Sequence, residues 1–198
     1  MAEGSKTMSQ LKKFLDDYGW DYLLDAKQTL RGLFTGGNGQ WHWMARYPEP
    51  GRFLLFVGYC PLNVPQNRLA AAAEYLMRAN WGLQFGNFEI DWTDGRVSFR
   101  TSIPVNSSGV SAKALEHLVV GNCALMDRYL PGLLAVTVGG VKPAEAVHEA
   151  ECIRPDSDHS TDGQSSAGAT QVEPNGPTIG PEGLEQGRRL REFFPGNN

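Results

Sequence analysis

Hydrophobic residues in the first part of the chain recur at helical spacing and then at alternating spacing. Helical spacing predicts a first helix, which Ser9 caps and Gly19 ends. Its apolar face consists of Leu11, Phe14, Leu15 and Tyr18. Three strands are expected next, at 29–36, 40–47 and 52–60. The second alternates strictly, as a strand with one buried face does, and the third is a continuous apolar run, which is typical of a strand covered on both faces.

Helical spacing returns further along the first 150 residues. Asn67 is placed to cap a second helix, which ends at Gly82. Its inward residues are Leu69, Ala73, Leu76 and Met77. Ser111 is placed to cap a third helix, and Pro131 is expected to kink or end it. The apolar face of the third helix consists of Leu115, Leu118, Val119, Asn122, Leu125, Met126 and Tyr129. A short last helix is expected from Pro143.

Residues 86–105, GNFEIDWTDGRVSFRTSIPV, predict a β-hairpin around Asp94-Gly95, a favoured two-residue turn. The apolar pairs in this register are Trp92 with Val97, Ile90 with Phe99, and Phe88 with Thr101. On the other face Glu89 lies opposite Arg100, and Asp91 lies diagonal to Arg96 and Arg100. Cross-strand ion pairing accounts for these carboxylates better than catalysis does, because a general acid or base needs a shielded site.

The order of these elements predicts an α+β domain, with an α-β-β-β-α-β-β-α order and an antiparallel sheet, over residues 1–150. The composition changes after this domain. Residues 151–198 hold eight acids and four arginines, so they carry the whole formal net charge of −4. They are rich in Gly, Pro and Ser and hold few large apolar residues. We therefore expect 151–198 to be a disordered acidic tail, in which 182–194 could form a short helix.

Charge and cysteine content exclude several classes of protein. A pI near 5.6 argues against a general nucleic-acid binder and against a polybasic membrane anchor. No apolar run is long enough to span a membrane, and the N-terminus shows no secretory signal. Cys60, Cys123 and Cys152 are widely spaced and odd in number, which argues against a disulfide framework. A cytoplasmic location is expected.

The candidate catalytic and metal motifs are incomplete. The run HEAEC places His148 and Cys152 four residues apart, a spacing that suits two metal ligands on one helix face, but no third ligand is apparent. The glycine-rich loop at 36–39 lacks the Lys and Ser/Thr of a phosphate-binding loop. Asp127 and Arg128 are interpreted as structural charges at a helix end. We expect no catalytic residue, no metal and no cofactor.

Aromatic residues are more numerous than one covered sheet face requires. Some are expected in the core, and others are candidates for a partner-binding surface or a dimer seam. The candidates in the domain are Trp41, Trp43, Trp81 and Trp92. In the tail, Leu190, Phe193 and Phe194 share one side at helical spacing, as a short docking motif would, although a solvated tail end is the simpler interpretation.

Six motifs occur in an order that resembles a known family. They are NGQW at 38–41, CPLNVP at 60–65, RANWGLQFGNFEIDWTDG at 78–95, RTSIPV at 100–105, MDRYLPGLLAV at 126–136 and PAEAV at 143–147. This set resembles the YbjN-domain family, described as bacterial sensory transduction regulators, and especially its cyanobacterial-type members. The resemblance covers about residues 8–148. It implies a fold similar to that of the type III secretion chaperones.

The resemblance implies a non-enzymatic, chaperone-like or regulatory module that binds a partner protein and forms a homodimer. It implies nothing about the tail, which lies outside the motifs. The alternative is a small-ligand sensor or an enzyme with a site in the concavity of the sheet. A small-ligand site needs a deep pocket with convergent polar groups, whereas the charged residues of the predicted hairpin pair with one another.

Overall fold

The computed structural model describes residues 3–48 and 53–152. The helices are α1 (Glu3–Asp17), α2 (Leu69–Gly82, preceded by the 3₁₀ turn Gln66–Arg68), α3 (Ala112–Thr137) and α4 (Pro143–Cys152). The strands are β1 (Leu23–Leu24), β2 (Leu30–Thr35), β3 (Gln40–Arg46), β4 (Phe53–Asn63), β5 (Asn87–Ile90) and β6 (Arg96–Pro104). The expected tail at 153–198, with its helix at 182–194, lies outside the described residues, while residues 151 and 152 belong to α4.

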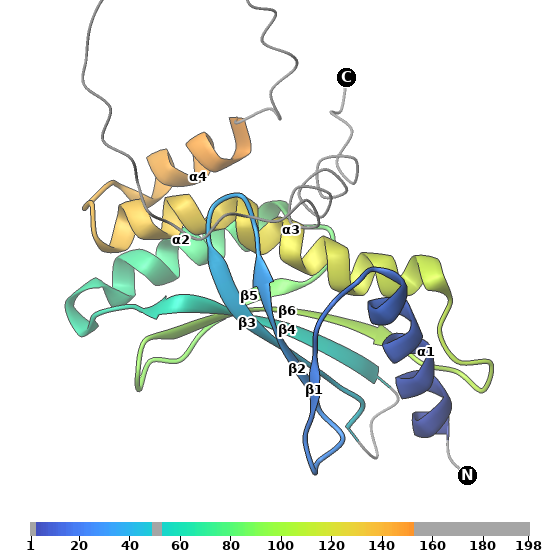
Figure 1. Ribbon diagram of the computed structural model, residues 1–198. Coiled ribbons are helices and arrows are strands. Elements are labelled where there is room, and N and C mark those ends of the chain that lie inside the picture. The colour runs from blue at the N-terminus through green and yellow to red at the C-terminus, as the bar shows by residue number, and fades with distance from the viewer. Residues whose placement is uncertain (1–2, 49–52, 153–198) are drawn as a thin grey trace, which may run out of the picture.

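All six strands form one antiparallel sheet in the order β1-β2-β3-β4-β6-β5. In Figure 1, α2, α3 and α4 lie on one side of this sheet, and α1 packs beside α3. Among the described elements, no helix lies on the opposite side. The α+β class and the antiparallel sheet predicted from the sequence are confirmed, with a two-residue β1 as an additional edge strand.

The core lies between the sheet and the helices. Trp41, Trp43 and Ala45 point inward from β3, as the alternation predicted, and each is at most 1% exposed. Trp43 stacks on Phe56 of β4 with ring centroids 5.1 Å apart. Gly32 on β2 makes room for this indole, because a Cβ there would lie 2.5 Å from a Trp43 ring carbon. The strictly alternating strand is thus the centre of the core.

Two helix boundaries differ from the sequence prediction. Helix α1 starts well before Ser9, and Thr7 and Met8 extend its buried face toward the N-terminus. Helix α3 continues through Pro131 to Thr137. Proline lacks the N–H that would bond the carbonyl of Asp127, four residues earlier. Asn38 Nδ2 donates to that carbonyl at 3.0 Å and replaces the missing hydrogen bond.

Helix α2 is rotated relative to the sequence prediction. Its buried residues are Leu69, Ala72, Tyr75, Leu76 and Ala79. Tyr75 sets this rotation, because its hydroxyl donates to the carbonyl of Tyr129 at 2.8 Å. Gly132 of α3 makes room for the ring, since a Cβ there would lie 2.3 Å from the Tyr75 hydroxyl. Met77, expected to face inward, is therefore 69% exposed.

The β5–β6 hairpin is shifted by two residues from the predicted register, with Phe88 opposite Phe99 and Ile90 opposite Val97. The turn is longer than Asp94-Gly95, because Asp91 N donates to the carbonyl of Arg96 at 2.8 Å. Val64 N, at the end of β4, donates to the carbonyl of Gly95 at 2.7 Å and holds this longer turn in place. A shift of two keeps the side chains of β5 and β6 on their predicted sheet faces. Trp92, predicted opposite Val97, instead lies in the turn.

Candidate functional site

The outer face of the sheet, opposite the helices, carries a row of apolar residues that we call the outer strip. It consists of Met44 on β3 and Phe53, Leu55, Val57 and Tyr59 on β4. Their neighbours along the strands, such as Leu54 and Phe56, belong to the core, whereas the outer-strip residues do not. The prediction that β4 is covered on both faces is therefore wrong for the described elements, because only its inner face packs under helices.

Cross-strand neighbours hold the outer strip in a defined order. Val57 lies between Met44 and Arg100, and it is only 3% exposed although no helix covers it. Leu55 lies between Arg46 and Ser102, and Phe53, at the strand end, is 49% exposed. The strip is thus a continuous row of apolar side chains, of which Phe53 is exposed, Met44, Leu55 and Tyr59 are partly exposed, and Val57 is covered by its neighbours.

Ion pairs surround the outer strip at the sheet edges. Arg31 pairs with Asp25 at 3.2 Å. Arg100 pairs with Glu89 at 2.9 Å, an ion pair that the sequence predicted, although Asn87 and not Glu89 lies directly opposite Arg100. Arg96 forms its ion pair with Asp94, at 2.9 Å.

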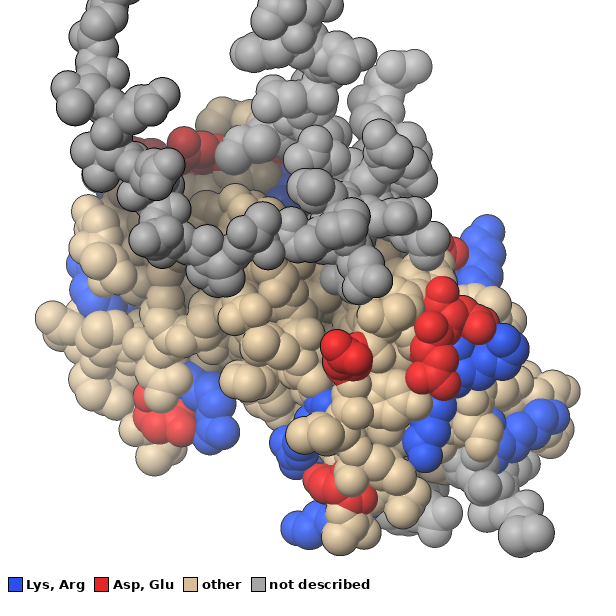
Figure 2. Space-filling model, in the orientation of Figure 1, with Lys and Arg blue, Asp and Glu red and all other residues tan. Residues whose placement is uncertain are grey.

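Figure 2 shows acidic and basic side chains next to one another over α1 and at the tip of the β5–β6 hairpin. The view holds no extended basic patch of the kind that binds nucleic acid.

A depression of about 480 Å³ opens where the outer face meets the hairpin. It is lined by Tyr59, Glu89, Ile90, Asp91, Trp92, Arg96 and Ser98. Asp91 accepts a hydrogen bond from Thr93 N at 2.8 Å, which holds its pKa below the ordinary value. The charged groups that line the depression already have partners within the hairpin. The depression therefore extends the outer strip from Tyr59 to the ring of Trp92 and is not a site with convergent free polar groups.

The run Met126-Asp127-Arg128-Tyr129 has structural roles, as the sequence interpretation held. The Asp127 carboxylate accepts hydrogen bonds from Gly37 N at 3.1 Å and Asn38 N at 2.8 Å, and so fixes the β2–β3 loop. Arg128 donates to the carbonyls of Ala150 and Glu151 at 2.9 and 3.0 Å and caps the end of α4. One turn of α3 therefore links the sheet to the last helix.

Asp127 gives a testable pH dependence. Burial raises the pKa of its carboxyl above the ordinary 3.8, although the hydrogen bonds from Asn38 N and Gly37 N act to lower it. Because the folded state holds this proton more tightly than the unfolded chain, the contribution of Asp127 to stability falls as pH rises from 3.8 through the raised pKa. We expect Asp127→Asn to reduce this loss of stability, measured by urea unfolding between pH 3.5 and 7.

Asp25 provides a control of opposite sign. Its pKa is lowered, chiefly by a hydrogen bond from Thr29 N, so its contribution to stability is lost as pH falls. Asp25→Asn should therefore weaken the loss of stability on acidification. Equal pH profiles for the two variants would contradict both assignments.

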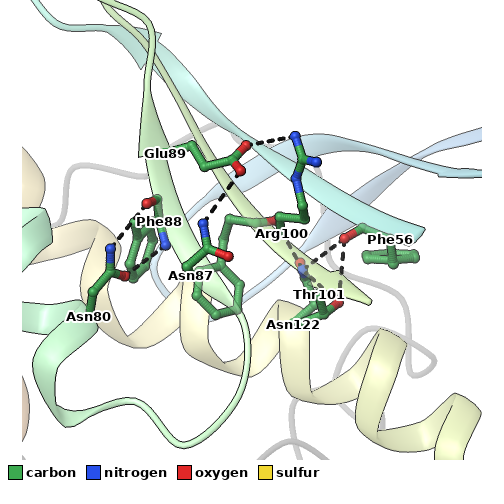
Figure 3. A network of polar contacts seen from close by, with 9 residues as sticks. Phe56, Asn80, Asn87, Phe88, Glu89, Arg100, Thr101 and Asn122 are labelled. Carbon is green, nitrogen blue, oxygen red and sulfur yellow. Dashed lines mark hydrogen bonds and ion pairs between the residues drawn. The ribbon is translucent and has the colours of Figure 1, made fainter. Parts of the chain in front are cut away.

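Two buried or half-buried amides tie the helices to the sheet (Figure 3). Asn80 of α2 donates to the carbonyl of Phe88 at 3.1 Å and accepts from its N–H at 2.8 Å, so it holds the edge strand β5. Asn122 of α3 is fully buried, and its Nδ2 lies 3.0 Å from the Phe99 carbonyl, 3.1 Å from Thr101 Oγ1 and 3.3 Å from the Phe56 carbonyl. Both amides have structural roles.

The structure separates the tryptophans that the sequence grouped as partner-binding candidates. Trp41 and Trp43 are each 1% exposed and belong to the core, so they contribute nothing to a surface in this fold. Trp81, at the end of α2, is 94% exposed, and Trp92, in the hairpin turn, is 58% exposed. The remaining candidates, Leu190, Phe193 and Phe194, lie outside the described residues.

The HEAEC run lies on α4, where Cys152 Sγ is 3.5 Å from His148 Nε2 and both residues are exposed. Within residues 3–48 and 53–152, no group of three or more His, Cys, Asp or Glu side chains is arranged to hold a metal ion. Cys60 and Cys123 are buried, and burial raises the pKa of both thiols. Neither buried cysteine has the lowered pKa of a reactive thiolate.

Sequence reasoning missed the outer strip. The signal was present, because Phe53, Leu55, Val57 and Tyr59 recur with a period of two within the continuous run of β4. A run that is apolar at every position does not show which of its two faces a helix covers.

The family model for "Putative bacterial sensory transduction regulator", YbjN, matches residues 7–135. The chain belongs to the YbjN family. The match begins within α1 and ends just before the last residues of α3, so the sheet and the outer strip lie inside the YbjN domain. The resemblance found from the motifs is confirmed.

Two solved structures are similar to this chain. The crystal structure of YbjN, a putative transcription regulator from E. coli, is 16% identical, with a TM-score of 0.50 over 65% of this chain and 90% of that chain. The HopA1–SchA chaperone–effector complex contains a chain that is 19% identical, with a TM-score of 0.43 over 64% of this chain and 96% of that one. No curated protein matches the chain. None of the described helices has both the length and the hydrophobicity to cross a bilayer.

Proposed function

We propose that this YbjN-family protein is a non-enzymatic regulatory or chaperone-like module that binds an apolar segment of a partner protein on the outer strip. The observation that carries the proposal is the strip itself: five apolar residues in register on a sheet face that no described helix covers. Apolar surface of this kind on a soluble domain is commonly a binding site. The family description, a regulator, agrees with such a role.

The chemistry of the outer face indicates what the segment contains. Arg46 and Arg100 flank Leu55 and Val57 on the neighbouring strands. A segment with apolar side chains for the strip and an acidic residue beside them would bury apolar area and meet the arginines. The proposed setting is the cytoplasm.

The proposal is tested by affinity capture from the native host, followed by mass spectrometry, with the full chain as bait. Leu55→Glu places a charge in the centre of the strip and should abolish capture of a specific partner. Thr35→Glu is the matched control, because Thr35 is exposed at the end of β2, away from the strip, and should retain the partner.

Circular dichroism and thermal melting check that both variants fold. Equal capture by Leu55→Glu and wild type would show that the outer strip is not the site. Purification with a stoichiometric small molecule and no protein partner would favour the ligand-sensor alternative instead, with the depression beside Trp92 as its site.

We also propose that the chain forms a homodimer and that its tail is not needed for folding. Removal of residues 153–198 should change the melting temperature by less than about 2 °C, because these residues hold few large apolar side chains. The cut is placed after Cys152, since Tyr129 donates to the Glu151 carboxylate at 3.2 Å and shorter chains lose this contact. A large fall in melting temperature would show that the tail packs on the domain.

A further inference from the structure

The outer strip ends in the depression beside the β5–β6 hairpin, and no described helix covers either of them. From Phe53 to Tyr59 the strip is about 20 Å long, at about 3.3 Å per strand residue. Tyr59 also lines the depression, whose other aromatic side chain is Trp92. The strip and the depression together form an elongated apolar surface, about as long as a helix of three to four turns.

The two ends of this surface carry opposite charges. Near the start of the strip, Arg46 lies beside Leu55 and forms no ion pair with a described residue. At the depression, Asp91 accepts a hydrogen bond from Thr93 N at 2.8 Å, and it also lacks an ion pair among the described residues. A segment that fits the surface would therefore carry an acidic residue at one end and a basic residue at the other.

The tail of this chain contains a segment with suitable apolar residues. Phe193 and Phe194 are the only aromatic residues of the tail, and they share one side with Leu190 at helical spacing. A helix over 182–194 would be about 20 Å long, which matches the length of the strip. An amphipathic helix of this kind is a common occupant of an apolar surface.

The charges of this segment follow the order that the surface requires. Glu182 stands at its start, and Arg189 would lie about 10 Å further along the helix, next to Leu190. With Glu182 near Arg46 and Arg189 near Asp91, Leu190 would pack on the centre of the strip. The two phenylalanines would then enter the depression, between its aromatic rings.

The chain between α4 and this segment is long enough for the contact. Helix α4 lies on the helix side of the sheet and ends at Cys152 (Figure 1). A Gly- and Ser-rich chain of the length of 153–181 spans about 30 Å on average and about 95 Å when fully extended. A domain of this size is roughly 40 Å across, so the segment can pass the sheet edge and reach the outer face.

We propose that residues 182–194 of this chain occupy the outer strip when no partner protein is bound, with Phe193 and Phe194 in the depression. This inference rests on the proposed function, because the tail takes the place of the apolar segment of the partner. The contact is weak and intramolecular: a local concentration of about 1 mM and a dissociation constant of about 1 mM leave the segment docked about half of the time.

Docking at this level has two consequences. It stabilises the domain only slightly, which agrees with the change of less than about 2 °C expected when the tail is removed. It also hides the strip from the partner about half of the time, so removal of the tail should raise the apparent affinity for the partner about twofold.

Photo-crosslinking of the full chain tests the contact. With p-benzoylphenylalanine in place of Phe194, the crosslinked peptides should contain Tyr59 or residues 90–98, which surround the depression. The same group in place of Val172, midway along the tail, is the control and should crosslink to these peptides at least about fivefold less. Crosslinks from position 194 to the helices alone, or none to the domain, would overturn the proposal.

Variants of the two partners in the contact sharpen this test. Trp92→Ala removes a ring that lines the depression and should lower the crosslink yield about threefold or more. Trp81→Ala is the matched control, since it removes an exposed indole on the helix side and should leave the yield within about 1.5-fold. Leu190→Glu should abolish the crosslink, and it lies outside the folded domain, so its result does not depend on the folding of a variant. Unchanged yield in both Trp92→Ala and Leu190→Glu would disprove the contact.

Failure of this proposal and failure of the proposed function give different results. If Leu55→Glu loses the partner protein but position 194 does not crosslink to the outer face, the strip binds the partner and the tail does not occupy it. If the crosslink forms but Leu55→Glu retains the partner, the tail contact stands and the proposed partner site is wrong. A crosslink that joins two copies, detected by mixing isotope-labelled and unlabelled chains, would make a second copy the occupant and overturn the contact within one chain.

Discussion

Trp43→Ala is expected to lower the free energy of unfolding by about 3–5 kcal/mol, the usual cost of truncating a large buried aromatic residue. Trp43 is 1% exposed, stacks on Phe56 and packs against Trp20 with ring centroids 5.7 Å apart. Its replacement leaves a cavity that the sheet cannot close, because β2 and β4 are fixed on both sides by their ladders. Chemical denaturation of the variant measures the effect.

Trp92→Ala is the control for this first prediction. Trp92 is 58% exposed in the hairpin turn, so its loss should change stability by about 0.5 kcal/mol at most. Trp43→Phe adds a second comparison, since it keeps an aromatic ring and removes an indole N–H that has no hydrogen-bond partner among the described residues. Similar losses for Trp43→Ala and Trp92→Ala would contradict the core position of Trp43.

Asn122→Asp is expected to destabilise the domain by about 3–5 kcal/mol at neutral pH, because it leaves a buried carboxylate without a cation. The Asn122 side chain is fully buried, and its Nδ2 faces the carbonyls of Phe56 and Phe99. A carboxylate in its place would face these oxygens without a proton to donate. The ionised form is therefore disfavoured in the folded state, and the pKa of the new carboxyl must be raised.

The sign of the pH dependence follows from that raised pKa. Stability should be lost as pH rises through it and partly recovered on acidification, since the protonated carboxyl can donate to one carbonyl. Asn122→Ala serves as the control, with a loss of about 1–3 kcal/mol that does not depend on the charge of residue 122. Denaturant midpoints of both variants are measured at pH 4.5 and pH 7.5. If the difference in midpoint between Asn122→Asp and Asn122→Ala is the same at both pH values, residue 122 of the Asp variant is not a buried ionised group.

The sequence predicted correctly those helices and strands that are determined by interactions between residues close together in the chain. The alternation of β3 identified Trp41, Trp43 and Ala45 as one face, and Ser111 does cap α3, accepting from Ala114 N at 3.2 Å. The helical spacing of α3 also placed Asn122 on its buried face. In each case the deciding interaction lies within a few residues, so the sequence alone carries it.

The errors arose where a distant residue decides the local structure. Pro131 does not end α3, because Asn38, far earlier in the chain, bonds the carbonyl that the proline leaves unpaired. The hairpin turn is lengthened by Val64 at the end of β4. Tyr75 rotates α2 through its bond to α3 and thereby exposes Met77. Local propensity contains no information about these contacts.

The same limit applied to the candidate site. A count of aromatic residues does not distinguish the core indoles Trp41 and Trp43 from the exposed ones, Trp81 and Trp92. The distinction depends on which sheet face the helices cover, and that depends on the whole topology. The outer strip remained hidden in the sequence for this reason.

We expect helix α3 to tolerate no change of length between Asn122 and Tyr129. Asn122 meets β4 and β6, Asp127 meets the β2–β3 loop, and Arg128 meets the end of α4. Inserting or deleting one residue among them would rotate all later contacts by about 100° relative to Asn122 and move them by about 1.5 Å. Homologous chains should therefore vary in length in their turns, while the eight residues from Asn122 to Tyr129 form a segment without gaps.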